Sequence, residues 1–194
     1  MLTLLVGPTC VGKTTIWQAI LDADPKIKPF KTCTDRPMRE WEKDSKISQY
    51  HFLTPEEFTI ERFEGHFFEV EKFAKNMYGT RKKDLKRAIR APEWYLGVMD
   101  INGALAVKEK YHHEALTFFL LPPSIEVLKE RLLARGSETE EQIALRLERA
   151  VSSEIPRATL MDCQVVNENI DETVKFLLMF MNNHKESMDF LRGR

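Results

Sequence analysis

The chain has 194 residues, of which 43% are hydrophobic and 30% charged, as is typical of a globular protein with one sizeable core. Its 29 Lys and Arg residues against 30 Asp and Glu residues give a net charge of −1, so bulk electrostatics favour neither nucleic acid nor a membrane surface as a partner. Three cysteines without CxxC spacing argue against a disulfide framework or a zinc ribbon, and no apolar run is long enough to span a bilayer. We therefore expect a cytoplasmic protein that binds neither nucleic acid nor membrane.

Short apolar runs alternate with helical patterns along most of the chain, beginning with a buried strand over Leu2–Val6 and a helix over residues 14–22. Further buried strands are predicted at residues 94–99, Ala115–Leu121 and Cys163–Val166. Helices are predicted over residues 101–107, after Ser124 as N-cap, after a capping box at residues 137–140, and over residues 170–181. Strands that are buried on both faces and separated by helices predict a parallel sheet in a layered α/β fold.

Two segments depart from this alternation. Residues 31–81 are polar, aromatic-rich and full of turns, which predicts an inserted mixed α/β subdomain. Residues 135–152 are charged and helical and begin beside Gly136, as a mobile lid would. We therefore divide the chain into a core (residues 1–30, 82–134 and 153–194), an acceptor subdomain (residues 31–81) and a lid (residues 135–152).

The stretch GPTCVGKTT, residues 7–15, matches the pattern G-x-x-x-x-G-K-[ST] between a predicted strand and a predicted helix. In such a loop, backbone N–H groups and the helix N-terminus bind a polyphosphate, Lys13 reaches the β- and γ-phosphate oxygens, and Thr14 can ligate Mg²⁺. The alternative, a glycine turn with a surface lysine, is disfavoured by the strand–loop–helix context. Cys10 fits as a small side chain, with a redox-sensitive loop as the alternative. The sequence predicts a nucleoside triphosphate site made of Gly7, Pro8, Thr9, Cys10, Val11, Gly12, Lys13, Thr14 and Thr15.

Arginines recur in pairs near the predicted lid. Arg131 and Arg135 are four residues apart, and Arg146 and Arg149 are three apart on the next predicted helix. Like charges at this spacing destabilise a helix by a few tenths of a kcal/mol, and an anion between the helices would reverse that sign. Solvated arginines on a charged helix face are the alternative.

A second cationic cluster, Arg36 and Arg39 in TDRPMR, lies in the acceptor subdomain, which also contains Tyr50 and Tyr78. Two phosphate-seeking groups beside a triphosphate loop indicate one anion that donates a phosphoryl group and another that receives it. The sequence alone leaves the identity of the acceptor open.

Six motifs occur in the order and near the spacing found in guanylate kinases: GPTCVGKTT, TDRPMRE, YHFL, FFEVEKFAKNMYGT, PPSIEVLKERLLARGSETEEQIALRLERA and VVN. The chain therefore resembles the guanylate kinase family of P-loop nucleoside monophosphate kinases over residues 2–180. The resemblance implies a three-layer P-loop core, an acceptor subdomain, a helical lid, and Mg²⁺-dependent transfer of phosphate from ATP to GMP or dGMP. Alternatives are a kinase for another (deoxy)nucleoside monophosphate or a phosphorylated sugar, and a non-catalytic interaction module. The oligomeric state stays undetermined.

The resemblance also implies a role for each matching residue. The acceptor phosphate would be held by Arg36, Arg39, Tyr50 and Tyr78. The guanine base would be surrounded by Thr32, Glu69, Gly79, Thr80 and Asp100. The catalytic cations would be Lys13, Arg131, Arg135 and Arg146, with Asn167 near the adenine of ATP.

The chemistry of guanine supports the role of Glu69 independently. Guanine presents adjacent N1–H and N2–H donors that one carboxylate accepts together, while Thr32 or Thr80 supplies a hydroxyl to O6. Adenine lacks the N1–H, and a buried polar group left unpaired in this way costs about 1–3 kcal/mol, more when it is charged. Strand alternation alone would make Glu69 a solvent-facing residue beside Glu71, and the resemblance reverses that reading.

Four positions depart from the family pattern. Val98 stands where the family commonly has an acidic residue, which leaves Asp100 alone to support the metal. Trp41 and Lys75 replace glycines, and Asp35 replaces a threonine. Because fewer glycines imply a stiffer acceptor loop, we expect an effect on the choice between ribo- and deoxyribonucleotides.

Overall fold

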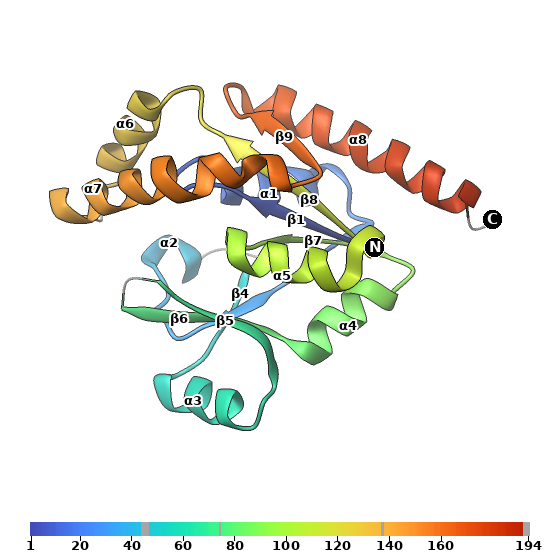
Figure 1. Ribbon diagram of the computed structural model, residues 1–194, viewed down its shortest axis with the longest axis horizontal. Coiled ribbons are helices and arrows are strands. Elements are labelled where there is room, and N and C mark those ends of the chain that lie inside the picture. Colours follow the sequence, from blue (N-terminus) through green and yellow to red (C-terminus); the bar gives the residue numbers. More distant parts are fainter. Residues whose placement is uncertain (44–46, 74, 137, 192–194) are drawn as a thin grey trace.

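The computed structural model describes residues 1–43, 47–73, 75–136 and 138–191, with Trp41 and residues 188–191 described by their backbone alone (Figure 1). A five-stranded parallel sheet has the order β2-β7-β1-β8-β9. Its strands are β1 (Leu2–Val6), β2 (Ile27–Pro29), β7 (Trp94–Val98), β8 (Ala115–Leu121) and β9 (Cys163–Val166). The predicted parallel sheet is confirmed. The edge strand β2 was not predicted because three residues are too short to show a period.

Helices cover both faces of this sheet. They are α1 (Lys13–Ala23), α4 (Lys82–Arg90), α5 (Ile101–Tyr111), α6 (Ile125–Arg135) and α8 (Ile170–Leu191), with a 3₁₀ turn at His112–Glu114. All five residues of β1 are buried because alternate side chains enter different cores. Leu5 packs with α1, α6 and α8, whereas Leu4 and Val6 pack with α4 and α5. The core therefore has the three layers that were predicted.

The acceptor subdomain contains a second, mixed sheet of order β4-β3-β6-β5. Its elements are β3 (Thr32–Thr34), α2 (Glu40–Lys43), β4 (Tyr50–Phe52), α3 (Pro55–Phe63), β5 (Phe67–Phe73) and β6 (Asn76–Arg81). Strand β3 pairs parallel with β4 and antiparallel with β6. A small core of Cys33, Phe58 and Phe67 lies inside it. In Figure 1 this subdomain lies below the parallel sheet, on the side opposite to α6, α7 and α8.

The helix α7 (Glu140–Arg149) starts later than the predicted capping box at residues 137–140, and that prediction is wrong. Its N-cap is Thr139, which accepts from the backbone N–H of Gln142, whose side chain accepts from the N–H of Thr139. The sequence holds two overlapping boxes, and the later start leaves Glu138 outside the helix, where it pairs with Arg146. Ser137 lies outside the described residues.

The lid has no loop at its C-terminal end. Helix α7 runs directly into a π-helical turn (Ala150–Glu154) and a 3₁₀ segment (Ile155–Leu160). Helix α8 likewise continues to Leu191, past its predicted end at residue 181, because no glycine or proline interrupts the chain there. No helix in the described part of the chain is both long and apolar enough to cross a membrane.

Candidate active site

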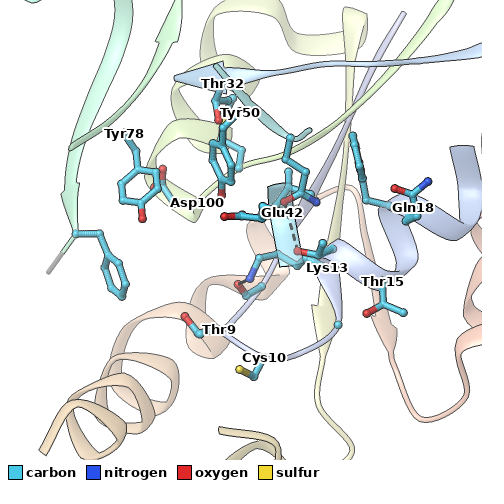
Figure 2. A pocket seen from close by; sticks show the side chains of 18 of the residues that line it. Thr9, Cys10, Lys13, Thr15, Gln18, Thr32, Glu42, Tyr50, Tyr78 and Asp100 are labelled. Atoms are coloured by element: carbon cyan, nitrogen blue, oxygen red, sulfur yellow. Dashed lines mark hydrogen bonds between the residues drawn. The ribbon is translucent and has the colours of Figure 1, made fainter. Parts of the chain in front are cut away.

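A cavity of about 1050 Å³ lies where the core, the acceptor subdomain and the lid meet (Figure 2). In Figure 2, Tyr50 and Tyr78 lie on one side, Thr9 and Cys10 on the other, and Lys13 between them. The predicted site residues that line it are Gly7, Thr9, Cys10, Gly12, Lys13, Thr14, Thr15, Thr32, Arg39, Tyr50, Glu69, Tyr78, Gly79, Asp100, Arg131, Arg135, Arg146 and Asn167. The predicted site residues that lie behind this lining are Pro8, Val11, Arg36 and Thr80.

The phosphate-binding loop closes around the side chain of Lys13. Its Nζ donates to the carbonyl oxygens of Gly7 at 2.6 Å and Pro8 at 2.7 Å. Burial lowers the pKa of Lys13 to about 8, although the nearby carboxylate of Glu154 opposes that shift. The ammonium group therefore lies in a place where an added anion would stabilise its charge.

Asn167 supports this loop from behind. Its Nδ2 donates to the carbonyl of Val11 at 2.8 Å, and its Oδ1 accepts from the hydroxyl of Thr173 at 3.1 Å. Gly12 has φ +105°, and a Cβ there would lie 2.4 Å from Asn167 Nδ2. The loop sequence therefore needs glycine at position 12 for both its backbone conformation and the close approach of Asn167.

Gln49 connects the acceptor subdomain to the phosphate-binding loop. The hydroxyl of Thr14 donates to Gln49 Oε1 at 3.3 Å, which leaves the lone pairs of that hydroxyl available to a cation. Gln49 Nε2 is buried and has no hydrogen-bond partner among the described residues. Our sequence analysis missed Gln49, and its position before Tyr50 was the only available signal.

Arginines of α6 and α7 reach the phosphate-binding loop. Arg146 Nη1 donates a hydrogen bond to the hydroxyl of Thr9 at 3.0 Å, and Arg135 Nη1 lies 3.5 Å from Cys10 Sγ. Arg131 donates to the backbone carbonyl of Val11 in the loop at 3.4 Å and to that of Asn167 at 3.3 Å. Three separated arginines thus converge on one wall of the cavity, next to Lys13.

Arg36 does not face the cavity as directly as the resemblance implied. Its guanidinium forms a two-point pair with the carboxylate of Glu42, at 2.7 and 2.9 Å, and lies 5.5 Å from the ring centre of Tyr50. The same carboxylate accepts from the backbone N–H of Arg39 at 2.7 Å. Arg39 lines the cavity, where burial and the charge of Arg135 lower its pKa. Glu42, to which our sequence analysis gave no role, therefore organises this cationic cluster.

Tyr50 and Tyr78 form the wall next to this cluster. Their ring centres are 6.0 Å apart in an edge-on arrangement. Burial raises the pKa of Tyr50 to about 12, so its phenol keeps its proton at neutral pH. A protonated phenol beside arginines is suited to donate a hydrogen bond to a phosphate.

Glu69 lies on β5, with Thr80 opposite it on β6. The hydroxyl of Thr80 donates to Glu69 Oε1 at 2.6 Å. Burial raises the pKa of Glu69 to about 7, with smaller contributions from Asp100 and Glu71. Asp100 caps α5 by accepting from two backbone N–H groups of that helix, so its carboxylate has a fixed position in the cavity.

Two further residues of β5 were missed by the sequence analysis as site residues. Glu71 lies 3.5 Å from Arg149, and the ring of Phe73 lies close to both Arg146 and Arg149. Both side chains line the cavity. The alternation in FFEVEKF places them on the face of Glu69, which was the signal available.

Comparisons with known proteins find one family over almost the whole chain. The family described as guanylate kinase matches residues 1–184. A guanylate kinase of Chlorobium luteolum is 37% identical over 182 residues, which cover 94% of this chain and 91% of that protein. One of Synechocystis sp. is 35% identical over 184 residues, 95% of this chain and 94% of that protein.

Solved structures show the same likeness. A guanylate kinase from Anaplasma phagocytophilum superimposes with a TM-score of 0.74 at 26% identity, over 94% of this chain and 85% of that chain. A shikimate kinase from Bacteroides thetaiotaomicron, with a TM-score of 0.54 at 17% identity over 94% of this chain and 98% of that chain, shares the fold alone.

Proposed function

This chain belongs to the guanylate kinase family, and we infer from that premise that it transfers the γ-phosphoryl group of ATP to GMP. The observation that carries the proposal is a carboxylate, Glu69, in the same cavity as the phosphate-binding loop and the arginines Arg131, Arg135 and Arg146. Because GMP and dGMP share the base and the phosphate that these groups would bind, we propose both as acceptors.

Guanine would be read by the carboxylate of Glu69, which accepts from N1–H and N2–H together. The Thr80 hydroxyl holds one of the two carboxylate oxygens in place, and Thr32, which lines the cavity, would donate to O6. Adenine would leave the carboxylate unpaired. Base selection therefore follows from the hydrogen-bonding pattern of the purine edge.

The acceptor phosphate would bind to Arg39, Tyr50 and Tyr78. Arg36 would act from one layer further back, because its guanidinium holds Glu42 and Glu42 holds the backbone of Arg39. A phosphate monoester already carries nucleophilic oxygens at neutral pH, so transfer needs no dedicated base. The task of the site is to align two anions and to neutralise their repulsion.

Lys13, Arg131 of the core and the lid arginines Arg135 and Arg146 would neutralise the charge of the triphosphate and of the phosphoryl group in transfer. The hydroxyl oxygen of Thr14 fits a Mg²⁺ ion, since its proton is engaged by Gln49 and its lone pairs are free. When bound, that ion would draw charge from the β- and γ-phosphate oxygens. The closed lid would keep water from the γ-phosphate. Asn167 would hold the loop in shape and lie beside the bound ATP.

A coupled assay for ADP formation tests this proposal with GMP, dGMP, AMP, CMP and UMP as acceptors. We expect turnover with GMP and dGMP and at least 10²-fold less with the others. The variant Glu69→Gln is expected to lose guanine selectivity, whereas Glu56→Gln, an exposed glutamate on α3, is expected to match wild type. Equal turnover with AMP, or none with GMP, would overturn the proposal.

A further inference from the structure

One face of β5 extends from the acceptor site to the lid. Alternate residues of a strand share a face, so Glu69, Glu71 and Phe73 point the same way, and all three line the cavity. Phe73 lies roughly 13 Å along the strand from Glu69, at about 3.3 Å per residue. The proposed function uses Glu69 alone, which leaves two side chains of this face without a role.

The ring of Phe73 lies against two arginines of the lid. The guanidinium carbon of Arg146 is 4.7 Å from the ring centre, and that of Arg149 is 4.8 Å from it. Arginines three residues apart on one helix repel each other, and the negative face of an aromatic ring attracts both. The ring belongs to the acceptor subdomain and the arginines belong to the lid, so this contact joins these two parts of the chain.

Arg149 is held by carboxylates as well. Its Nη2 lies 3.5 Å from Glu71, and its Nε lies 3.1 Å from Glu154, which follows the lid. Glu71 also accepts from Asn102 of the core at 3.3 Å. Arg149 is therefore held between the acceptor subdomain and the end of the lid. Arg146 pairs with Glu138 of the lid at 2.8 Å and extends past Phe73 to the hydroxyl of Thr9 in the phosphate-binding loop.

We propose that Phe73 is a positioning residue that places Arg146 over the triphosphate, and that with Glu71 it couples acceptor binding at Glu69 to closure of the lid. The inference rests on the proposed function, because it takes Arg146 to serve the triphosphate and Glu69 to bind the base. A nucleotide base held by Glu69 fixes β5, and a fixed β5 presents the ring on which Arg146 and Arg149 dock. The acceptor then raises the affinity of the enzyme for the triphosphate. By linkage, the triphosphate raises the affinity for the acceptor by the same factor.

A role in apolar packing alone would make different predictions. Leucine at position 73 keeps an apolar contact and loses the ring, whereas tyrosine keeps the ring. The coupling role therefore predicts that Phe73→Tyr behaves as wild type and Phe73→Leu does not. Phe63 of α3, which is 93% exposed, gives the matched control Phe63→Leu.

Calorimetry with a non-hydrolysable ATP analogue, in the presence and absence of GMP, measures the coupling directly. In wild type we expect GMP to raise the affinity for the analogue. We expect Phe73→Leu to reduce that enhancement about fivefold to tenfold, a loss of the size that cation–π contacts support, with GMP affinity alone unchanged within twofold. In turnover with saturating ATP, we expect Phe73→Leu to lower kcat and to raise the KM for GMP, because the bound triphosphate then no longer strengthens the binding of the acceptor. Phe73→Tyr and Phe63→Leu are expected to keep the wild-type enhancement.

Glu71→Gln provides a second variant, which keeps the side-chain volume and loses the charge that faces Arg149. We expect it to reduce the enhancement about twofold to threefold. The inference would be overturned if Phe73→Leu kept the full enhancement. If Phe73→Leu does not fold, a full enhancement in Glu71→Gln would overturn it instead. Independent binding of GMP and the analogue to wild type would overturn it as well. A wild type that binds no GMP would instead overturn the proposed function.

Discussion

The hydroxyl of Thr80 donates a 2.6 Å hydrogen bond to Glu69 Oε1 across the β5–β6 pair. This bond favours the charged carboxylate, but burial disfavours it more strongly and raises the pKa of Glu69 to about 7. In the free enzyme the carboxyl group is therefore close to half protonated at neutral pH. Base recognition and pH are linked at this one side chain.

The KM for GMP should rise as the pH falls below 7, because guanine needs the charged form of Glu69 and acid supplies the neutral form. The limiting slope is about tenfold per pH unit. The phosphate of GMP titrates in the same range, with a second pKa of about 6, so Glu69→Gln supplies the baseline. Its kcat/KM for GMP is expected to be lower by about 10²–10³ and to show the phosphate titration alone. A wild-type profile parallel to that of Glu69→Gln would contradict the assignment.

The same variant should be more stable than wild type at pH 8. Because the pKa of Glu69 in the folded protein lies above its ordinary value of 4.5, the folded state binds the proton more tightly, and stability falls as the pH rises from about 4.5 to 7. Glu69→Gln removes this penalty, and we expect a gain of roughly 1–2 kcal/mol at pH 8 and none at pH 4.5. Urea unfolding at the two pH values measures the difference. If Glu69→Gln were less stable than wild type at pH 8, the charged form of Glu69 would not destabilise the folded protein, and the prediction would be wrong.

Glu42→Ala and Glu40→Ala form a matched pair on the short helix α2. Glu42 and Arg36 are both 9% exposed, and removing one partner leaves a buried charge unpaired, at a cost of about 3 kcal/mol. Glu40 pairs with Lys43 in solvent, so its removal is expected to cost no more than about 0.5 kcal/mol. Only Glu42→Ala should also raise the KM for GMP, since Glu42 holds the backbone of Arg39. Equal effects of the two variants would refute this role.

Much of the core could be predicted because its signals are local. Apolar runs fixed the ends of β1, β8 and β9, and the hydroxyl of Ser124 caps α6 as expected from its position before an apolar helix. The phosphate-binding loop was predicted because the loop, the strand before it and the helix after it are contiguous in sequence. Helix α8 ran past its predicted end because the chain contains no stop signal there.

The missed site residues share a different origin. These residues contact partners that no sequence period links to them, and most of the partners are distant in sequence. Gln49 contacts Thr14, Phe73 contacts Arg146, and Glu42 is the third such residue. The sequence also could not show that Arg36 lies outside the lining of the cavity, since that depends on its pair with the carboxylate of Glu42. Residue type and motif therefore indicated which chemistry to expect, and only the fold showed which side chains support it.

Gly12→Ala is expected to be far more damaging than Gly136→Ala, although both glycines have positive φ, at +105° and +65°. At Gly136 the described residues leave space for a Cβ, and alanine would add backbone strain alone, about 1 kcal/mol. At Gly12 the new Cβ would displace the amide of Asn167 and break its bond to Val11, which adds roughly 1–3 kcal/mol. Thermal unfolding and ATP binding should both separate the two variants. Similar unfolding temperatures would mean that the side chain of Asn167 can move away from the new Cβ without a loss of stability.

Lys13→Met should leave a protein that folds well and hardly turns over. Removing the cation that faces the phosphates is expected to lower kcat by about 10³. Because burial lowers the pKa of Lys13 from 10.5 to about 8, the unfolded chain binds this proton more tightly, and the charged lysine opposes folding at pH 7. Methionine should therefore raise the stability of the free enzyme at pH 7 by roughly 1 kcal/mol, with the advantage shrinking as the pH rises through 8 to 10.5. Lys86→Met, at an exposed site on α4, is the control and should change neither quantity. Wild-type turnover in Lys13→Met would contradict the role of Lys13 in binding the phosphates. A less stable Lys13→Met protein would contradict the prediction that Lys13 does not stabilise the fold.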